Sequence, residues 1–221
     1  MGCQLSKRRK RVFKVIIVGD AAVGKTCLSF RFCNGKFPDR TEATIGVDFR
    51  ERTIETDDGE VLRVQLWDTA GQERFRQSMT SHFYRSADAV VFVYDVTRLN
   101  TFKSLHHWLE ECQKFVGGGA ETPARIVIGN KCDARTEAAS TVLTTQAQIW
   151  ADSHGMALFE TSAKAQSEAD HVESIFMTLV HKLKNRQNIQ LPSAQNSTTQ
   201  NAINLAENSN SDAAQQDGWC C

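Results

Sequence analysis

The amino-acid sequence predicts an α/β fold: a doubly wound, six-stranded, mostly parallel sheet with one antiparallel edge strand. Short apolar runs rich in β-branched residues recur along the chain, and segments with helical periodicity lie between most of them. Two adjacent runs are joined only by a turn signal, as in a hairpin. Alternating strands and helices are typical of a parallel sheet, which binds its ligands at the carboxyl ends of its strands.

The strands are predicted in order from these runs. Residues 13–18 are almost continuously apolar and end at Gly19, which indicates a strand buried on both faces. Residues 47–56 and 61–67 flank the turn signal at 57–59, so they are expected to form a β-hairpin. Three further strands are expected at residues 89–94, 125–128 and 157–160.

Helices are expected between and after the strands. The first begins near Lys25 and runs through Phe32. The later ones are predicted at residues 101–115, 144–153 and 171–186. Each lies where an α/β fold needs a connection between parallel strands.

Length and composition predict one folded domain with a tail at each end. The chain has 221 residues, with 26 basic and 26 acidic side chains, so no global charge points to nucleic acid as a partner. We expect a basic tail over residues 1–11, a folded domain over 12–187 and a disordered tail over 188–221, rich in Asn, Gln, Ser and Ala. No apolar stretch is long enough to span a bilayer, and no signal peptide is visible.

The seven cysteines show no spacing typical of a disulfide framework or a zinc site. Four lie in or beside apolar segments and are expected to be reduced thiols in or near the core: Cys27, Cys33, Cys112 and Cys132. The other three lie at the ends of the chain, where packing cannot explain them: Cys3, Cys220 and Cys221.

The run from Gly19 to Thr26 fits the phosphate-binding pattern G-x-x-x-x-G-K-[ST]. It follows a predicted buried strand and precedes a predicted helix, which is the context that this pattern requires. Backbone N–H groups of such a loop surround a β-phosphate at the helix N-terminus. Lys25 is expected to reach the β- and γ-phosphates, and the Thr26 hydroxyl to bind Mg²⁺.

The run Asn130-Lys131-Cys132-Asp133 fits the N-K-x-D pattern of a guanine reader. An ionised carboxylate only accepts hydrogen bonds, and guanine offers it two donors, the ring N–H and the exocyclic amine. Adenine presents an acceptor and a C–H group there. Asp133 is therefore predicted to select guanine.

Taken together, the motifs resemble those of the Ras superfamily of small GTPases, and more narrowly those of Rab proteins. Besides the two runs above, the resemblance rests on Asp68-Thr69-Ala70-Gly71-Gln72-Glu73, Ile45-Gly46-Val47-Asp48-Phe49 and Ser162-Ala163-Lys164. It covers about residues 12–187 and implies the P-loop GTPase fold. Details such as Cys27-Leu28-Ser29-Phe30 are most similar to the Golgi- and autophagy-linked Rab subfamily.

The resemblance implies a role for each residue that matches a family motif. The nucleotide site would comprise Asp20, Ala21, Ala22, Val23, Gly24, Lys25, Thr26, Cys27, Phe37, Thr44, Gly71, Asn130, Lys131, Asp133, Ser162, Ala163 and Lys164. Mg²⁺ would be held by Thr26, Thr44 and Asp68. Catalysis would use Lys25 and Gln72, of which Gln72 would orient the attacking water. An effector-binding aromatic surface would comprise Phe49, Trp67 and Phe83.

The same resemblance implies a regulatory cycle. The chain would alternate between GDP and GTP, with exchange factors, GTPase-activating proteins, a GDP-dissociation inhibitor, a prenylation escort protein and trafficking effectors as partners. Cys220 and Cys221 fit geranylgeranylation rather than a C-a-a-X box. The expected location is the cytoplasmic face of Golgi or related vesicle membranes, in exchange with the cytosol.

Two alternatives follow from the same residues. Ala21 and Ala22 stand where many Ras-like proteins have Gly, so a slowly hydrolysing, GTP-bound membrane scaffold is the rival from another class. A P-loop kinase or ATPase is a third reading, which Asp133 argues against. Gln72 argues against the scaffold.

The first residues generate a prediction of their own. Met1-Gly2-Cys3-Gln4-Leu5-Ser6 fits the N-myristoylation pattern M-G-x-x-x-[ST], and Cys3 is placed for palmitoylation. The basic residues Lys7 to Arg11 would strengthen such an anchor at an anionic leaflet. We expect a myristoyl mass shift on the N-terminal peptide from eukaryotic cells and its loss in Gly2→Ala. A free or acetylated terminus would rule the anchor out.

Overall fold

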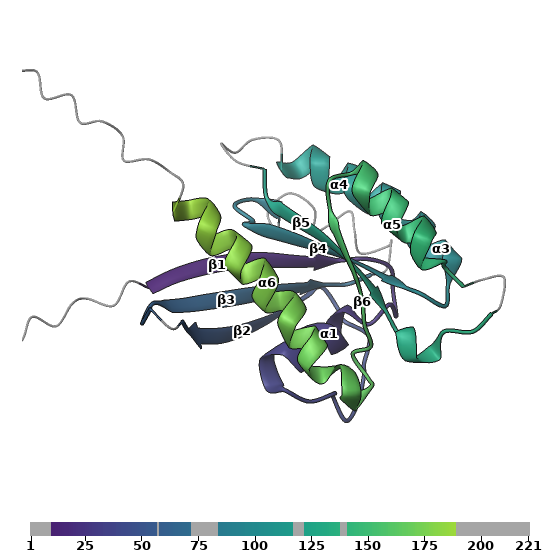
Figure 1. Ribbon diagram of the computed structural model, residues 1–221, viewed down its shortest axis with the longest axis horizontal. Helices are drawn as coiled ribbons and strands as arrows, with labels where there is room; N and C mark the ends of the chain where they lie inside the picture. Colours follow the sequence, from purple (N-terminus) through teal and green to yellow (C-terminus); the bar gives the residue numbers. More distant parts are fainter. Residues whose placement is uncertain (1–9, 57, 72–83, 117–121, 138–140, 189–221) are drawn as a thin grey trace, which may run out of the picture. The chain divides into compact units, whose positions relative to one another are not determined.

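The computed structural model describes residues 10–56, 58–71, 84–116, 122–137 and 141–188 (Figure 1). Six strands form one sheet in the order β2-β3-β1-β4-β5-β6. Their bounds are β1 Lys10–Val18, β2 Val47–Glu55, β3 Val61–Thr69, β4 Ala89–Asp95, β5 Ala124–Asn130 and β6 Ala157–Glu160. Only β2 and β3 pair antiparallel, and β2 lies at the edge. The predicted fold class is confirmed.

Helices cover both faces of the sheet. On one face lie α1 (Lys25–Asn34) and α6 (Ala169–Asn188); on the other lie α3 (Leu99–Lys103), α4 (Leu105–Val116) and α5 (Thr144–Ser153) (Figure 1). Two short 3₁₀ turns, η2 (Cys132–Ala134) and η3 (Gln166–Glu168), follow β5 and β6. Across the described ranges, no helix combines the length and the apolar character needed to cross a bilayer.

Each face of the sheet has its own hydrophobic core, because side chains along a strand alternate between faces. On the α1 and α6 side, Phe32 stacks on Phe176 with ring centroids 4.6 Å apart. On the other side, Tyr94 meets the edge of Phe102 at 5.2 Å. All seven residues of β4 are buried, as expected for a central strand covered on both faces.

The first strand is longer than predicted, since β1 begins at Lys10 rather than at residue 13. Lys10 and Arg11 pair with the start of β3, and the Arg11 guanidinium lies 3.0 Å from the Glu60 carboxylate. Arg11 also donates to the backbone oxygen of Lys184 in α6. Two residues of the expected basic tail therefore belong to the sheet.

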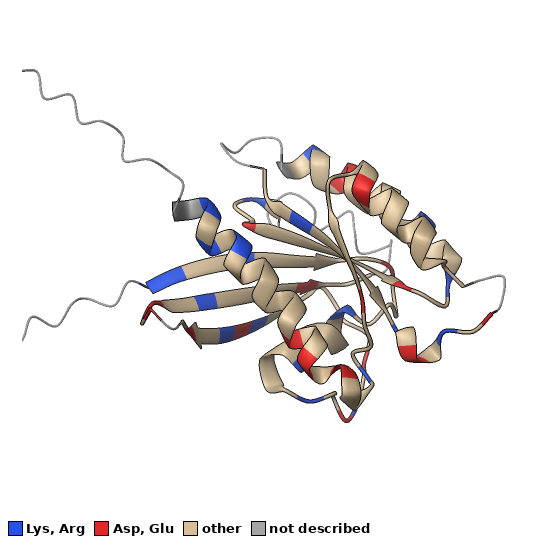
Figure 2. Cartoon of the chain, viewed as in Figure 1, with Lys and Arg blue, Asp and Glu red and all other residues tan. Residues whose placement is uncertain are grey.

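The helix predicted over residues 101–115 is divided into α3 and α4 at Ser104. The backbone N–H and the hydroxyl of Ser104 both donate to the backbone oxygen of Asn100, at 3.0 Å, and the Trp108 N–H donates to the Ser104 oxygen, at 3.1 Å, so helical hydrogen bonds continue across this junction. The final helix is longer than predicted at both ends. Figure 2 shows acidic residues in the first part of α6 and basic residues near its end, an arrangement that suits the helix dipole.

The four cysteines predicted to be reduced are free thiols: Cys27, Cys33, Cys112 and Cys132. Burial raises the pKa of the Cys112 thiol to about 11, so this side chain packs as a neutral apolar group.

Gly129 precedes Asn130 in β5 and provides a test of the packing. A Cβ there would lie 2.6 Å from the Tyr94 hydroxyl oxygen and 2.9 Å from a Val96 methyl carbon. Gly129→Ala should lower the free energy of unfolding by about 1–3 kcal/mol, as overpacking does in other cores. Urea titration measures this. Tyr94→Phe removes the hydroxyl oxygen but keeps the ring carbon Cζ, which would lie 2.7 Å from the added Cβ, so the double variant should recover only a small part of the stability that Gly129→Ala loses.

Candidate functional site

The phosphate-binding loop lies between β1 and α1, and its conformation depends on glycine. Gly24 precedes the first residue of α1 with a left-handed φ of 97°. A Cβ at Gly24 would lie 2.2 Å from the Asn130 side-chain nitrogen, so no larger residue fits there. Ala22 also takes a left-handed φ, of 62°, which is uncommon for a residue with a side chain.

Lys25, the first residue of α1, is buried against this loop. Its ammonium donates to the backbone oxygens of Gly19, at 2.8 Å, and Asp20, at 2.9 Å. These bonds hold a positive charge beside the N-terminus of α1. A helix N-terminus with an adjacent lysine favours an anionic ligand.

Three oxygen-bearing side chains from different segments converge beside Lys25. The Thr26 hydroxyl lies 2.8 Å from the Thr44 hydroxyl and donates to an Asp68 carboxylate oxygen 2.5 Å away. Asp68 is fully buried near the end of β3. Burial raises the pKa of Asp68 to about 6, against the opposing effects of the Thr26 hydrogen bond and the Lys25 charge.

The second oxygen of Asp68, Oδ1, has no hydrogen-bond partner among the residues that the structure describes. A buried carboxylate oxygen without a partner is costly, and a cation would satisfy it. Mg²⁺ prefers oxygen ligands such as these hydroxyls and this carboxylate. The residues present therefore fit Mg²⁺.

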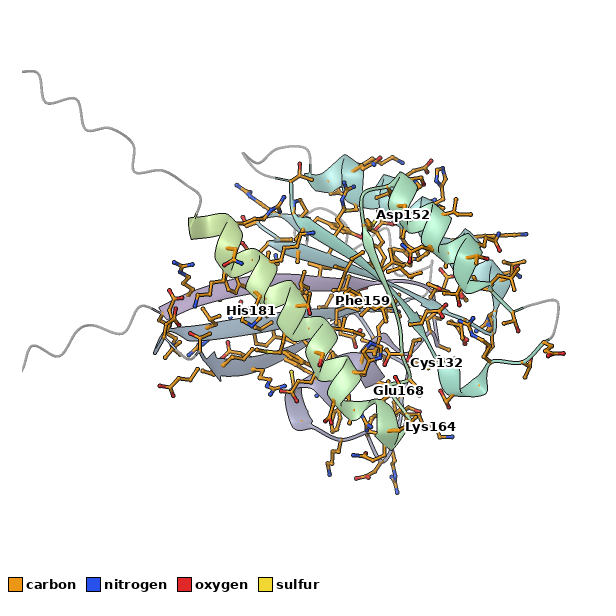
Figure 3. The ribbon with its side chains drawn as sticks, in the orientation of Figure 1. Cys132, Asp152, Phe159, Lys164, Glu168 and His181 are labelled. Carbon is orange, nitrogen blue, oxygen red and sulfur yellow. The ribbon has the colours of Figure 1, made fainter. Side chains whose placement is uncertain are left out.

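On the other side of the loop, Asn130 connects two segments. Its amide nitrogen donates to the backbone oxygen of Val23, at 2.8 Å, and its amide oxygen accepts from the backbone N–H of Ala163, at 3.0 Å. Ser162 is buried, and its hydroxyl accepts from the backbone N–H groups of Lys164 and Ala165. Figure 3 labels Cys132 and Lys164, which mark the two segments that Asn130 holds together with the phosphate-binding loop.

These segments enclose one cavity of about 630 Å³. Of the residues predicted to bind the nucleotide, fifteen line it: Ala21, Ala22, Gly24, Lys25, Thr26, Cys27, Phe37, Thr44, Gly71, Asn130, Lys131, Asp133, Ser162, Ala163 and Lys164. Its lining also includes four residues that were not predicted to bind the nucleotide: Thr41, Glu42, Ala43 and Ala134. Each lies close in sequence to a motif residue, and this proximity is the one feature of the sequence that could have indicated a place in the cavity wall.

Two predicted nucleotide residues do not line the cavity. The Val23 side chain is fully buried in the core beneath the loop, and only its carbonyl faces Asn130. The Asp20 carboxylate accepts a hydrogen bond from the Trp108 indole N–H, at 2.9 Å. Both side chains therefore brace the loop from behind. Because Trp108 lies on α4, far from Asp20 in sequence, no local pattern indicates this contact.

Some of the other predicted functional residues lie in segments that the structure describes, and the rest lie outside them. Gly71 lies against the phosphate-binding loop, where an added Cβ would be 2.4 Å from the Ala21 backbone nitrogen. Phe49 is 46% exposed and meets the edge of the Trp67 ring at 5.2 Å. Gln72, which was predicted to be catalytic, and Phe83, which was predicted to belong to the effector surface, lie outside the described residues, as do the predicted lipidation sites Gly2, Cys3, Cys220 and Cys221.

Comparisons with known proteins agree with this geometry. A family model described as the Ras family matches residues 14–185. The chain is 56% identical over 217 residues to the Ras-related protein Rab-33 of Caenorhabditis elegans, covering 97% of this chain and 69% of the relative. It is also 56% identical over 176 residues to Ras-related protein Rab-33A of Mus musculus, covering 79% and 71%.

A plant relative is more distant. Ras-related protein RABD2c of Arabidopsis thaliana is 41% identical over 175 residues, covering 79% of this chain and 82% of the relative.

Proposed function

Because the chain belongs to the Ras family, as a Rab small GTPase similar to the Rab-33 proteins, we propose a specific role for it in Golgi-related vesicle trafficking and autophagy. As a member of this family it is a GTP hydrolase, it binds guanine nucleotides and it regulates membrane trafficking.

One observation carries the proposed site: phosphate-binding and base-reading segments line the same cavity. Lys25 and Thr26 lie at one side of it, and Asp133 and Ala163 belong to the segments on the other. At about 630 Å³ the cavity falls within the size range of sites that bind small molecules and cofactors. A guanine nucleotide would place its triphosphate at the side of Lys25 and Thr26 and its base at the side of Asp133 and Ala163.

At the base end, Asp133 accepts hydrogen bonds from the ring N–H and the amine of guanine, and the guanine oxygen shares the Ala163 backbone N–H with the Asn130 amide oxygen. The Lys131 stem lies over the base, and Phe37 lies against its edge. At the phosphate end, loop N–H groups and the Lys25 ammonium stabilise negative charge, which is the larger part of catalysis in phosphoryl transfer.

Thr26, Thr44 and Asp68 would hold Mg²⁺. When bound, the ion neutralises charge on the β- and γ-phosphate oxygens. Thr44 takes part only while the γ-phosphate is present, so its loss releases the segment around Thr44 and changes the surface that effectors recognise. Gly71 donates its N–H to the γ-phosphate, and Gln72 orients the attacking water.

The exposed Phe49 and the neighbouring Trp67 support an effector surface completed by Phe83. Exchange and activating proteins would set the nucleotide state, and a GDP-dissociation inhibitor and a prenylation escort protein would handle the lipid-modified chain. Two prenyl groups, on Cys220 and Cys221, give a lasting anchor where a single chain holds only marginally. The proposed location is the cytoplasmic face of Golgi-related membranes.

Base selection tests the site. Asp133→Asn replaces one acceptor oxygen with a donor, which opposes the guanine amine but suits the second carbonyl of xanthine. The affinity for GTP should fall by about 10²- to 10⁴-fold, with a relative gain for xanthosine triphosphate. Titration calorimetry measures both. Asp152→Asn, an exposed carboxylate on α5 labelled in Figure 3, is the matched control and should bind GTP as the parent does. Unchanged GTP binding by Asp133→Asn would remove Asp133 from the site.

The rate of GTP hydrolysis tests the proposed catalytic role of Gln72. Gln72→Leu should keep nucleotide affinity but lose most of the partner-free turnover, since Leu cannot orient water; that turnover is on the order of 10⁻⁴ s⁻¹ in this class of enzyme. A single-turnover assay with purified protein measures it. Equal rates for variant and parent would contradict the mechanism, and a parent with no measurable turnover would favour the GTP-bound scaffold.

A further inference from the structure

Asp95 is a buried carboxylate beside the base-reading segment that no motif accounts for. It is the last residue of β4, its side chain is 1% exposed, and it pairs in register with Asn130 of β5. One carboxylate oxygen, Oδ1, accepts from the Thr97 backbone N–H, at 2.9 Å, and the Thr97 hydroxyl, at 2.7 Å. The other, Oδ2, lies 2.6 Å from the Lys131 ammonium.

These contacts keep Asp95 ionised. Burial by itself raises the pKa of the carboxyl, but the hydrogen bonds from Lys131 and Thr97 outweigh burial and lower the pKa overall. The carboxylate is thus paired and hydrogen-bonded, the condition under which a buried charge is tolerated.

Lys131 spans two parts of the cavity wall. Its ammonium also donates to the backbone oxygen of Ala22, at 2.7 Å, in the phosphate-binding loop. The side chain is 36% exposed, and its backbone takes a left-handed φ of 69°. Lysine loses much rotamer entropy when it is ordered, so a partly exposed lysine held in one position needs strong acceptors. A carboxylate forms the stronger, charge-assisted bond of the two acceptors.

We propose that Asp95 is a positioning residue for the bound nucleotide, which acts by holding Lys131 across the rim of the cavity and thereby slows nucleotide release. The inference rests on the proposed guanine-nucleotide site. Asp95 itself does not line the cavity, so its effect passes through Lys131. With the carboxylate in place, the lysine stem is already ordered before the base packs against it.

The geometry separates this role from a general structural one. The two oxygens of Asp95 have different partners: Thr97 braces the turn that follows β4 through Oδ1, and in the part of the chain that the structure describes only Lys131 contacts Oδ2. Asp95→Asn can keep an oxygen toward Thr97 while presenting an amide to Lys131. Thr97→Ala removes only the hydroxyl bond on the opposite side.

The experiment measures dissociation of fluorescent N-methylanthraniloyl-GDP from the purified full chain. Asp95→Asn should release it about tenfold faster than the parent, the effect of losing one charge-assisted hydrogen bond. Lys131→Met, which keeps the aliphatic stem and alters no buried residue, should release it faster by a similar factor. In the double variant the two effects should not multiply, because both remove the same interaction. Thr97→Ala, the matched control, should stay within twofold of the parent.

A second measurement, with inosine diphosphate, distinguishes the proposed role from a general loosening of the loops, which would change the ratio of two dissociation rates. Inosine diphosphate lacks the amine that Asp133 reads, so the ratio of its dissociation rate to that of GDP reports on base reading alone. Asp95→Asn should leave this ratio unchanged while accelerating both rates. Multiplying effects in the double variant, an altered ratio, or parent-like release from both Asp95→Asn and Lys131→Met would each overturn the inference. A parent that fails to retain GDP would overturn the proposed function as well.

Discussion

The side-chain amide of Asn130 is the interaction on which the rest of the site depends. It donates to the phosphate-binding loop at Val23 and accepts from the base-side segment at Ala163, and the residue is only 2% exposed. Both halves of a buried amide are therefore satisfied, and a buried polar group of this kind rigidifies its surroundings only when that holds. The absence of a side chain at Gly24 follows from the same contact, because a Cβ there would collide with the amide nitrogen. One residue thus sets the distance between the two sides of the cavity.

Asn130 can reach both sides because the parallel sheet brings the carboxyl ends of its strands to one edge. β1 leads into the phosphate-binding loop, β3 carries Asp68 near its end, β5 ends at Asn130, and β6 leads into Ser162 and Ala163. Behind this edge, the Glu160 carboxylate accepts from the Tyr94 hydroxyl and the Thr144 hydroxyl and pairs with Arg135. Core packing beneath this edge and polar bonds along it hold the loops in place. Together they determine the shape of the cavity.

The sequence predicts those features that depend on residues close together in the chain, and it does not predict contacts between residues far apart. Strands such as 13–18 and 89–94 were predicted because a buried parallel strand is apolar throughout, and the hairpin because its turn signal is local. The cavity residues were identified where a motif states its chemistry in consecutive positions, as at Lys25 and Asp133. The contacts from Trp108 to Asp20 and from Lys131 to Asp95 join residues far apart in sequence, so no periodicity or spacing could indicate them.

The segment around Thr44 differs physically from the framework that surrounds it. It belongs to no helix or strand, and its neighbour Ile45 is 84% exposed, so little apolar burial holds it in place. Two polar contacts with other described residues hold it: the Thr44 hydroxyl lies beside the Thr26 hydroxyl, and the Gly46 carbonyl accepts from the Ala70 backbone N–H. A segment with few buried contacts opens at a low free-energy cost, whereas opening a strand that is buried throughout, such as β4, costs much more. A ligand that adds one or two polar bonds at Thr44 would therefore order this segment without disturbing the fold, as the proposed nucleotide-dependent switch requires.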